Sequence, residues 1–489
     1  MRAQEYHQMQ DEVGYCVASR DFMVFLDGLP TIKINDMVVS DNGIRGWVSS
    51  LYENKVEVLV LDEGIISPGQ LFKRVKAKVS IATGEYLLGR AINPLGVPID
   101  GKRMLSKSEN DKLYELDTAA PPLSMRKFIT DQFVTGVSLI DTLLPLGKGQ
   151  RQLVIGDAHA GKTAFLLDLI INQRDSNVVC IYASIGKPIT QVKSMLELLG
   201  NTGALAYTVM IAASSSEAAP LIYLTPQTAF TIAEYFQRTG RDVLLILDDI
   251  GNHAKIYREI SLLSGRSPGR ESYPGDIFYQ HSNLLERAGS FKAEGGGGSI
   301  TALPVLELNL SDFSGFLPTN LIGMTDGHLL FNSNLRNQGR IPAIDISLSV
   351  TRVGRQTQNR LQNLLSNKIR QLLAQAEDLE TVSRFSAELP YETRLILKQK
   401  AIIQELISQE GLVRIPIAGQ IVLLALPFTA LFLDKDVNFI QKNKPVLLNT
   451  LLKDQRVVQF SQSLLKLEVL DELLKALEPW IPVFAKMFK

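Results

Sequence analysis

The sequence predicts a multidomain protein: an N-terminal β-barrel over residues 1–100, a central α/β domain with a mostly parallel sheet over 101–354, and a C-terminal α-helical bundle over 355–489. Three observations predict this order. Short apolar runs between turn residues come first, apolar runs alternating with helix-length segments follow, and leucine stripes at helical spacing come last. A length of 489 residues suits two or three domains.

The first zone, from about residue 13 to residue 100, has strand-like composition interrupted at close intervals. Residues 22–26 and 56–60 are rich in β-branched and aromatic side chains, and turn signals such as Asp41-Asn42-Gly43 separate such runs. Many short strands at close spacing predict a small antiparallel barrel.

The central zone changes to fully apolar runs, such as 178–182 and 243–247. Runs of this kind, each followed by a helix-length segment, are typical of a parallel sheet that helices cover on both faces. After residue 354 the pattern becomes helical, with one apolar face formed by Leu361, Leu364, Leu365, Ile369, Leu372 and Leu373.

Composition excludes several classes of protein. Lys+Arg and Asp+Glu are 51 each, so no excess positive charge supports non-specific nucleic-acid binding. The two cysteines, Cys16 and Cys180, form no disulfide framework, which favours a reducing compartment. The apolar stretch 417–433 is short for a membrane span and contains Gln420, so we expect a buried helix there.

A phosphate-binding loop follows the apolar run 153–155. Its residues match Gly-x-x-x-x-Gly-Lys-Thr and are Gly156, Asp157, Ala158, His159, Ala160, Gly161, Lys162 and Thr163. Glycines let backbone N–H groups turn toward phosphate oxygens, and the next helix presents its positive N-terminal end to them. We therefore predict a nucleotide site, with Lys162 on the outer phosphates and Thr163 on Mg²⁺.

A second acidic strand end follows the run 243–247, where Asp248 and Asp249 stand together. In phosphate-loop proteins such an aspartate completes the Mg²⁺ shell, usually through water, and Asp248 is the candidate. The alternative is an N-cap for the following helix, which suits Asp249 better.

Longer motifs carry a family resemblance. The run 267–276, Ser-Pro-Gly-Arg-Glu-Ser-Tyr-Pro-Gly-Asp, resembles that of alpha subunits of F-type ATP synthases. Further matches lie at 87–90, 147–151, 299–304 and 349–354. The beta subunit lacks the Pro-Gly-Arg-Glu form, so the resemblance is to alpha.

The resemblance implies a RecA-like central domain and an alternating ring of three alpha and three beta subunits around a gamma stalk. It also implies a peripheral stalk and a membrane sector that moves protons or sodium ions, on the cytoplasmic face of the bacterial inner membrane. ATP or ADP with Mg²⁺ would be bound, and the membrane would be reached only through that sector.

The resemblance also assigns residues. Arg352 matches the arginine that reaches the beta subunit's catalytic site, and Ser349 belongs to the same motif. Gln409 matches one of two glutamines near the adenine, whereas the second position is Gly411. Lys187 stands where alpha subunits have glutamine and where hydrolytic ring ATPases have a glutamate. A lysine is a poor general base, so we expect the isolated chain to bind nucleotide without hydrolysing it.

Other readings stay open. A homohexameric rotary or secretion ATPase would need the glutamate that Lys187 replaces. A Rho-type translocase would need basic and aromatic residues in its barrel, which are few here. A purely structural subunit with an empty site is a further alternative. Only about ten residues precede the barrel, so we expect the helix that docks the delta subunit to be absent.

Overall fold

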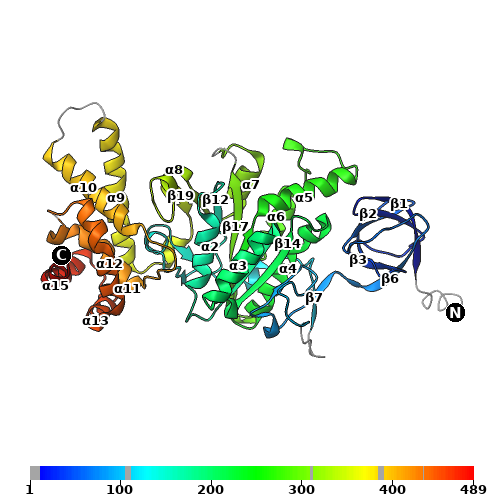
Figure 1. Ribbon diagram of the computed structural model, residues 1–489, viewed down its shortest axis with the longest axis horizontal. Helices are drawn as coiled ribbons and strands as arrows, with labels where there is room; N and C mark the ends of the chain where they lie inside the picture. The colour runs from blue at the N-terminus through cyan, green and yellow to red at the C-terminus, as the bar shows by residue number, and fades with distance from the viewer. Residues whose placement is uncertain (1–11, 105–111, 309–311, 384–389, 433, 489) are drawn as a thin grey trace. The chain divides into compact units, whose positions relative to one another are not determined.

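The computed structural model describes residues 12–104, 112–308, 312–383, 390–432 and 434–488 (Figure 1). These residues group into two compact units, each of which is described by itself. The first comprises 1–127, 175–308 and 312–325, and the second comprises 128–174, 309–311 and 326–489.

The first unit begins with a closed antiparallel barrel in the strand order β1-β2-β5-β4-β3-β6. Its strands are β1 (Val13–Arg20), β2 (Met23–Asp27), β3 (Asp36–Ser40), β4 (Arg45–Leu51), β5 (Val56–Val60) and β6 (Leu71–Lys78). Val24, Val38, Val58 and Phe72 are fully buried in its core, because alternate side chains of each strand point inward. The barrel predicted from short strands is confirmed over residues 13–78.

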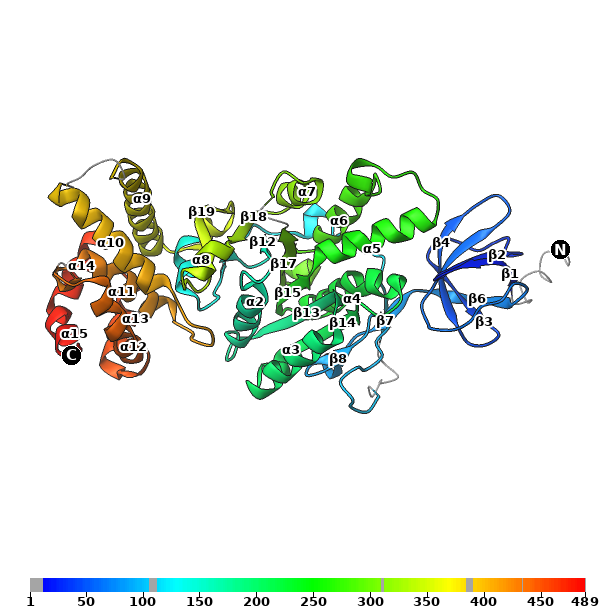
Figure 2. The same ribbon diagram turned by 45° about the horizontal axis from the view of Figure 1, so that its top comes forward.

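The rest of the first unit is an α/β layer whose strands run in the order β17-β15-β13-β14-β8 (Figure 2). All neighbouring pairs in this order are parallel. The strands are β8 (Ala91–Ile92), β13 (Val178–Lys187), β14 (Thr208–Ser214), β15 (Asp242–Asp248) and β17 (Ser299–Leu308). Short strands at the margins are β7 (Ser80–Ala82), which pairs with β9 (Leu113–Glu115), and β16 (Gly289–Ser290), which pairs with β17.

Helices cover this layer, so its strands are buried along most of their length. Those that pack on its strands are α3 (Ile189–Asn201), α4 (Ala219–Arg238) and α5 (Ile250–Leu263). Helix α6 (Ile277–Leu285) packs against α4, and α7 (Phe316–Met324) packs against α6. Helix α4 packs against β13, β14 and β15. The predicted parallel α/β arrangement is confirmed.

The second unit holds the phosphate loop between β12 (Leu153–Asp157) and α2 (Lys162–Ile171). Strand β12 pairs in parallel with β18 (Gly327–Phe331), which pairs antiparallel with β19 (Ile344–Thr351). The remaining elements before the bundle are β10 (Gln132–Phe133), a π-helical turn (Leu139–Leu143), β11 (Leu146–Gly147) and α8 (Ser333–Asn337).

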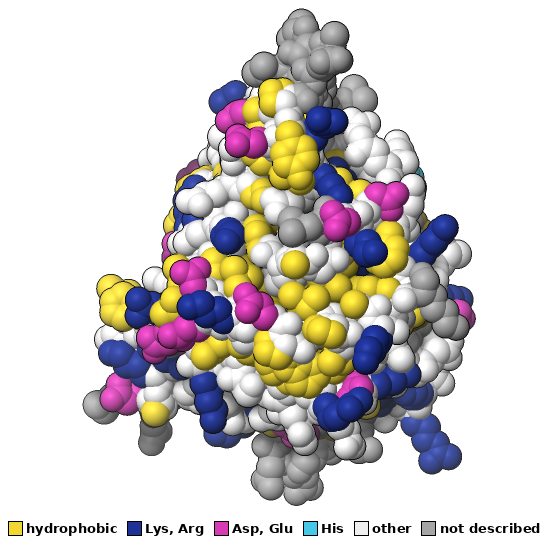
Figure 3. Space-filling model, turned by 90° about the vertical axis from the view of Figure 1, so that its left-hand side faces the viewer, with side chains coloured by type: hydrophobic (Ala, Val, Ile, Leu, Met, Phe, Trp, Pro, Cys, Tyr) yellow, Lys and Arg dark blue, Asp and Glu magenta, His cyan; other side chains and the backbone are white. Residues whose placement is uncertain are grey.

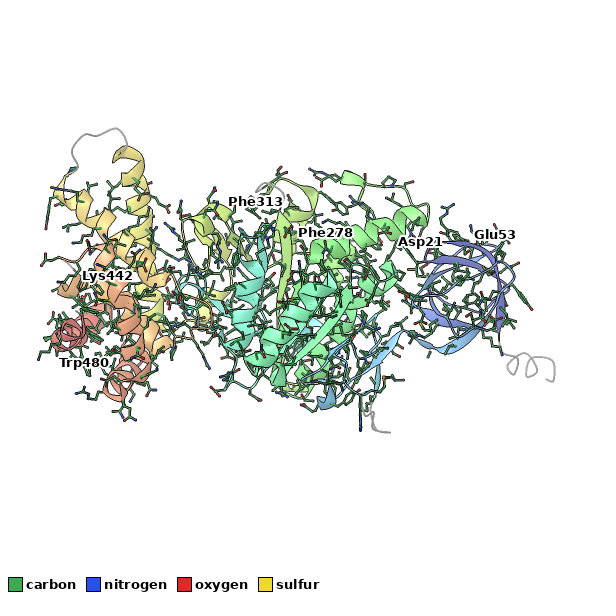
Figure 4. The ribbon with its side chains drawn as sticks, in the orientation of Figure 1. Asp21, Glu53, Phe278, Phe313, Lys442 and Trp480 are labelled. Carbon is green, nitrogen blue, oxygen red and sulfur yellow. The ribbon has the colours of Figure 1, made fainter. Side chains whose placement is uncertain are left out.

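The second unit ends in helices, as predicted. They are α9 (Arg360–Ser383), α10 (Tyr391–Ile407), α11 (Ile417–Ala425), α12 (Val437–Lys453), α13 (Gln455–Leu464), α14 (Leu470–Leu477) and α15 (Ile481–Met487). The stripe predicted on α9 is buried except at Leu364, which is 38% exposed. Trp480, labelled in Figure 4, stacks on Phe460 with ring centroids 4.4 Å apart. On the face shown in Figure 3, hydrophobic side chains (yellow) form a patch with charged side chains scattered around it.

The apolar stretch 417–433 contains the buried helix α11, as predicted, followed by short 3-10 turns. In the part of the chain that the structure describes, no helix combines the length and apolarity needed to cross a membrane. The predicted absence of a docking helix falls on residues 1–11, which lie outside the described residues. The domain bounds 1–100, 101–354 and 355–489 stay a prediction.

Candidate functional site

The phosphate loop turns sharply where β12 ends, and Gly156 makes this turn possible. Its φ is +155°, and a Cβ built on it would lie 2.1 Å from the carbonyl oxygen of Phe331 in β18. A side chain at position 156 would therefore collide with backbone. The loop closes at Gly161, which has a φ of +98° and caps the N-terminus of α2.

The cationic groups beside this loop face its backbone. Lys162 is 7% exposed, and its ammonium donates to the carbonyl oxygens of Gly156, at 2.8 Å, and Asp157, at 2.5 Å. A Cβ built on Gly161 would lie 3.8 Å from Nη1 of Arg336, an exposed residue of α8. Two cations therefore stand at the N-terminal end of α2, where the helix dipole also favours an anion.

The other predicted loop residues occupy different environments. Asp157 accepts a hydrogen bond from Ser333 Oγ at 3.0 Å, and Ala160 is fully buried. Ala158 and His159 are exposed at the tip, and His159 has a left-handed φ of +59°. Thr163 is half-buried in the first turn of α2. Its hydroxyl supplies an oxygen, which is the ligand atom that Mg²⁺ prefers. The loop residues fit a phosphate chain.

Asp248, the predicted magnesium residue, is bound by other side chains of the first unit. Its Oδ2 accepts from the Lys187 ammonium at 2.5 Å and from the Tyr182 hydroxyl. Only 2% of the Asp248 side chain and 14% of the Lys187 side chain is exposed. A metal ion at Asp248 would have to compete with this ammonium, and Lys187 cannot act as a base while it is paired.

Asp249 has the role that the alternative reading gave it. Its carboxylate caps α5 by accepting from the Gly251 N–H at 2.5 Å. Burial, and then the negative charge of Asp248, raise the pKa of Asp249 to about 6. The charge of Lys187 acts in the opposite direction, so the ammonium stabilises both neighbouring carboxylates.

Arg352 lies just after β19, and its side chain is exposed. Its backbone N–H donates to the Asp326 carbonyl at 3.0 Å. Burial, and to a smaller extent the Arg352 charge, lower the pKa of His328 in β18. An exposed guanidinium at this point can reach a group outside the chain.

Ser349 is buried and bonds to backbone. Its Oγ donates to the Asp345 carbonyl at 2.5 Å and accepts from the Leu330 N–H at 2.9 Å. These bonds lie where the register of β18 and β19 shifts. The side chain therefore fixes the strand pair that precedes Arg352.

Gln409 lines a small cavity beside α2, which it shares with Gly161, Phe165, Asp168, Arg336 and Pro342. Its side chain is 5% exposed, and its amide is bound to backbone groups of the second unit. Sequence reasoning did not single out Asp168 or Arg336. An acid inside an amphipathic helix and an arginine in a short polar segment carry no motif that distinguishes them from surface residues.

Comparison with known proteins agrees with these features. Residues 136–351 match the nucleotide-binding domain of the ATP synthase alpha/beta family. An ATP synthase subunit alpha from Metamycoplasma arthritidis is 38% identical over 480 residues, which cover 98% of this chain and 90% of that protein. The chain belongs to the ATP synthase alpha-subunit family.

Two further alpha subunits show similar likeness. The one from Mesomycoplasma hyopneumoniae strain 7448 is 41% identical over 416 residues, covering 85% of this chain and 82% of the relative. The one from Caldanaerobacter subterraneus subsp. tengcongensis is 41% identical over 399 residues, covering 81% and 78%. The resemblance and the fold class predicted from the sequence are thus confirmed.

Proposed function

We propose that this chain is the non-catalytic, nucleotide-binding alpha subunit of an F-type ATP synthase. In a ring with beta subunits around a gamma stalk, it would hold ATP or ADP with Mg²⁺. It would act at the membrane through the ion-translocating sector and a peripheral stalk, on the cytoplasmic side of a bacterial membrane. The coupled ion would be a proton or sodium.

The observation that carries the non-catalytic role is the ion pair between Lys187 and Asp248. Hydrolysis needs a carboxylate or equivalent group that orients water, and Lys187 at that position is an ammonium held 2.5 Å from a buried acid. This pairing also disfavours the alternative of a self-sufficient homohexameric motor.

The phosphate loop supports the binding half of the proposal. Lys162 would turn from the loop carbonyl oxygens to the outer phosphates, and the Thr163 hydroxyl would ligate Mg²⁺. Asp248 is our candidate for the metal's water shell, in competition with Lys187. Mg²⁺ would neutralise part of the negative charge of the phosphates. The positive N-terminal end of the α2 dipole would also favour that charge.

The proposal extends to the neighbouring subunit. Arg352 would stabilise the charge that develops on a phosphoryl group in the beta site, a role worth on the order of a thousand-fold in rate. Ser349 would keep the β18–β19 register that presents this arginine.

Titration of the purified chain with ATP in Mg²⁺, together with an assay for phosphate release, tests the proposal. We expect saturable binding without turnover. Lys162→Ala should weaken binding strongly because the ammonium is lost, whereas Lys193→Ala, on the exposed face of α3, should leave it unchanged. Steady hydrolysis by the chain alone, or equal affinity of Lys162→Ala and wild type, would contradict the proposal.

A further inference from the structure

The cavity expected to receive the nucleotide base is too small for one. It measures about 30 Å³ and lies beside α2, between Phe165, Pro342, Gln409 and Val413. Small-molecule sites begin at roughly 300 Å³. A space of about 30 Å³ holds at most two or three waters, by the rule that one water needs roughly 10–15 Å³.

Gln409 closes this cavity with both ends of its amide. Its Oε1 accepts from the Ser138 N–H at 3.0 Å, and its Nε2 donates to the carbonyl oxygens of Gly136, at 2.8 Å, and Val413, at 2.5 Å. Its backbone N–H donates to the Ile341 carbonyl at 2.6 Å. The Gln409 amide therefore bonds within the chain and holds the segment 409–415 in place. The side chain does not present this amide to a ligand.

The partners of Gln409 are themselves fixed. The buried carboxylate of Asp141 accepts from the Gly136 N–H and from Gln420 Nε2, both at 2.8 Å. At the other end of the segment, the Leu412 N–H donates to Asp168 Oδ1 on α2 at 3.1 Å. A base contact to the Gln409 amide would replace a bond that this amide already makes within the chain, so it would add little net affinity.

The phosphate end of the same unit is built differently. Lys162 and Arg336 stand beside the glycine loop at the N-terminus of α2, and the Lys162 ammonium donates to the loop carbonyl oxygens of Gly156 and Asp157. We infer that this subunit recognises the polyphosphate chain of its ligand and is indifferent to the base. This inference rests on the proposed nucleotide-binding function and names the ligand class of that site, which is polyphosphates and nucleoside triphosphates of any base.

The purified full-length chain should be titrated by calorimetry with ATP, GTP and inorganic tripolyphosphate, at one fixed Mg²⁺ concentration. We expect the three dissociation constants to agree within about tenfold, because base contacts add little to the phosphate contacts. ATP binding a hundredfold or more tighter than tripolyphosphate would overturn the inference and leave the proposed function intact. Failure of all three to bind would overturn the proposed function itself, and the inference with it.

Gln409→Ala tests the closing role directly, because it removes three hydrogen bonds and leaves Lys162 and Arg336 unchanged. We expect the ATP-to-tripolyphosphate affinity ratio to rise by fivefold or more as the cavity opens. Gln441→Ala is the matched control, since that glutamine lies exposed on α12 and its amide donates to Glu405 Oε2 at 3.2 Å. An unchanged ratio in Gln409→Ala, with its fold verified by circular dichroism, would refute the assignment of closure to Gln409. The wild-type titrations decide the inference even if the variant does not fold.

Discussion

Replacing Lys187 by methionine removes the ammonium from a buried ion pair and keeps most of the side chain's volume. Asp248 would then be a carboxylate that is 2% exposed, with the Tyr182 hydroxyl as its remaining side-chain donor in this pair of contacts. Removing one partner of a buried pair costs about 3–5 kcal/mol. Because the Tyr182 bond is retained, we expect about 3 kcal/mol, which is more than a hundredfold in the unfolding equilibrium.

The two tryptophans allow this loss to be measured in the correct unit. Trp47 lies in the first unit, stacked on Tyr223 with centroids 5.7 Å apart, whereas Trp480 lies in the second. In a Trp480→Phe background, fluorescence during urea unfolding therefore follows the first unit alone. The midpoint should fall for Lys187→Met. Lys255→Met, an exposed lysine on α5, is the control and should change stability little.

A double variant tests the same ion pair. Lys187→Met combined with Asp248→Asn should recover most of the stability, because the unpaired charge is then gone. A loss below about 1 kcal/mol, or a double variant as unstable as the single one, would show that the pair is not a buried charge pair in solution.

The remaining predictions concern the loop, an acid-sensitive pair and the ring. Gly156→Ala should abolish nucleotide binding by calorimetry and leave the barrel intact, because the added Cβ meets Phe331 oxygen at 2.1 Å; normal affinity would contradict the turn geometry. Although burial raises it, bonds from Arg90 and backbone groups hold the pKa of Asp100 at about 2, below its usual 3.8. Asp100→Asn should therefore cost about 2 kcal/mol at pH 6, and this difference should vanish between pH 4 and pH 2; a constant difference would argue against it. In an assembled ring, Arg352→Lys should lower turnover at the beta sites at least a hundredfold without changing their ATP affinity, because lysine lacks the planar fork; near-normal turnover would exclude this role.

The sequence predicted those features that follow from local pattern. Alternating and fully apolar runs gave the barrel strands and the buried strands β13 and β15, and the Gly-x-x-x-x-Gly-Lys-Thr spacing located the loop at β12 and α2. These depend on neighbours within a few residues, where side-chain period and glycine geometry leave few alternatives.

Contacts between distant segments were not predictable in the same way. Lys187 and Asp248 were each recognised, but their pairing depends on β13 lying beside β15, two strands separated by β14 in the chain. The family resemblance places Gln409 near the base, and nothing in the sequence around it indicates that its amide turns to Gly136 and Val413. Leu364 is exposed although it belongs to the predicted apolar stripe of α9. A residue at the edge of a helix's apolar face lies partly in solvent.

The closed barrel limits how the barrels of neighbouring copies of this chain can contact one another. Strand β1 pairs with both β2 and β6, so the strand order returns to its start and leaves no open edge among β1 to β6. An open edge is the usual template for strand exchange and fibre growth between neighbours. Neighbouring barrels can therefore meet only through side chains and loops. Contacts of that kind weaken with added salt when they are ionic, so added salt should separate neighbouring barrels without any exchange of strands between them.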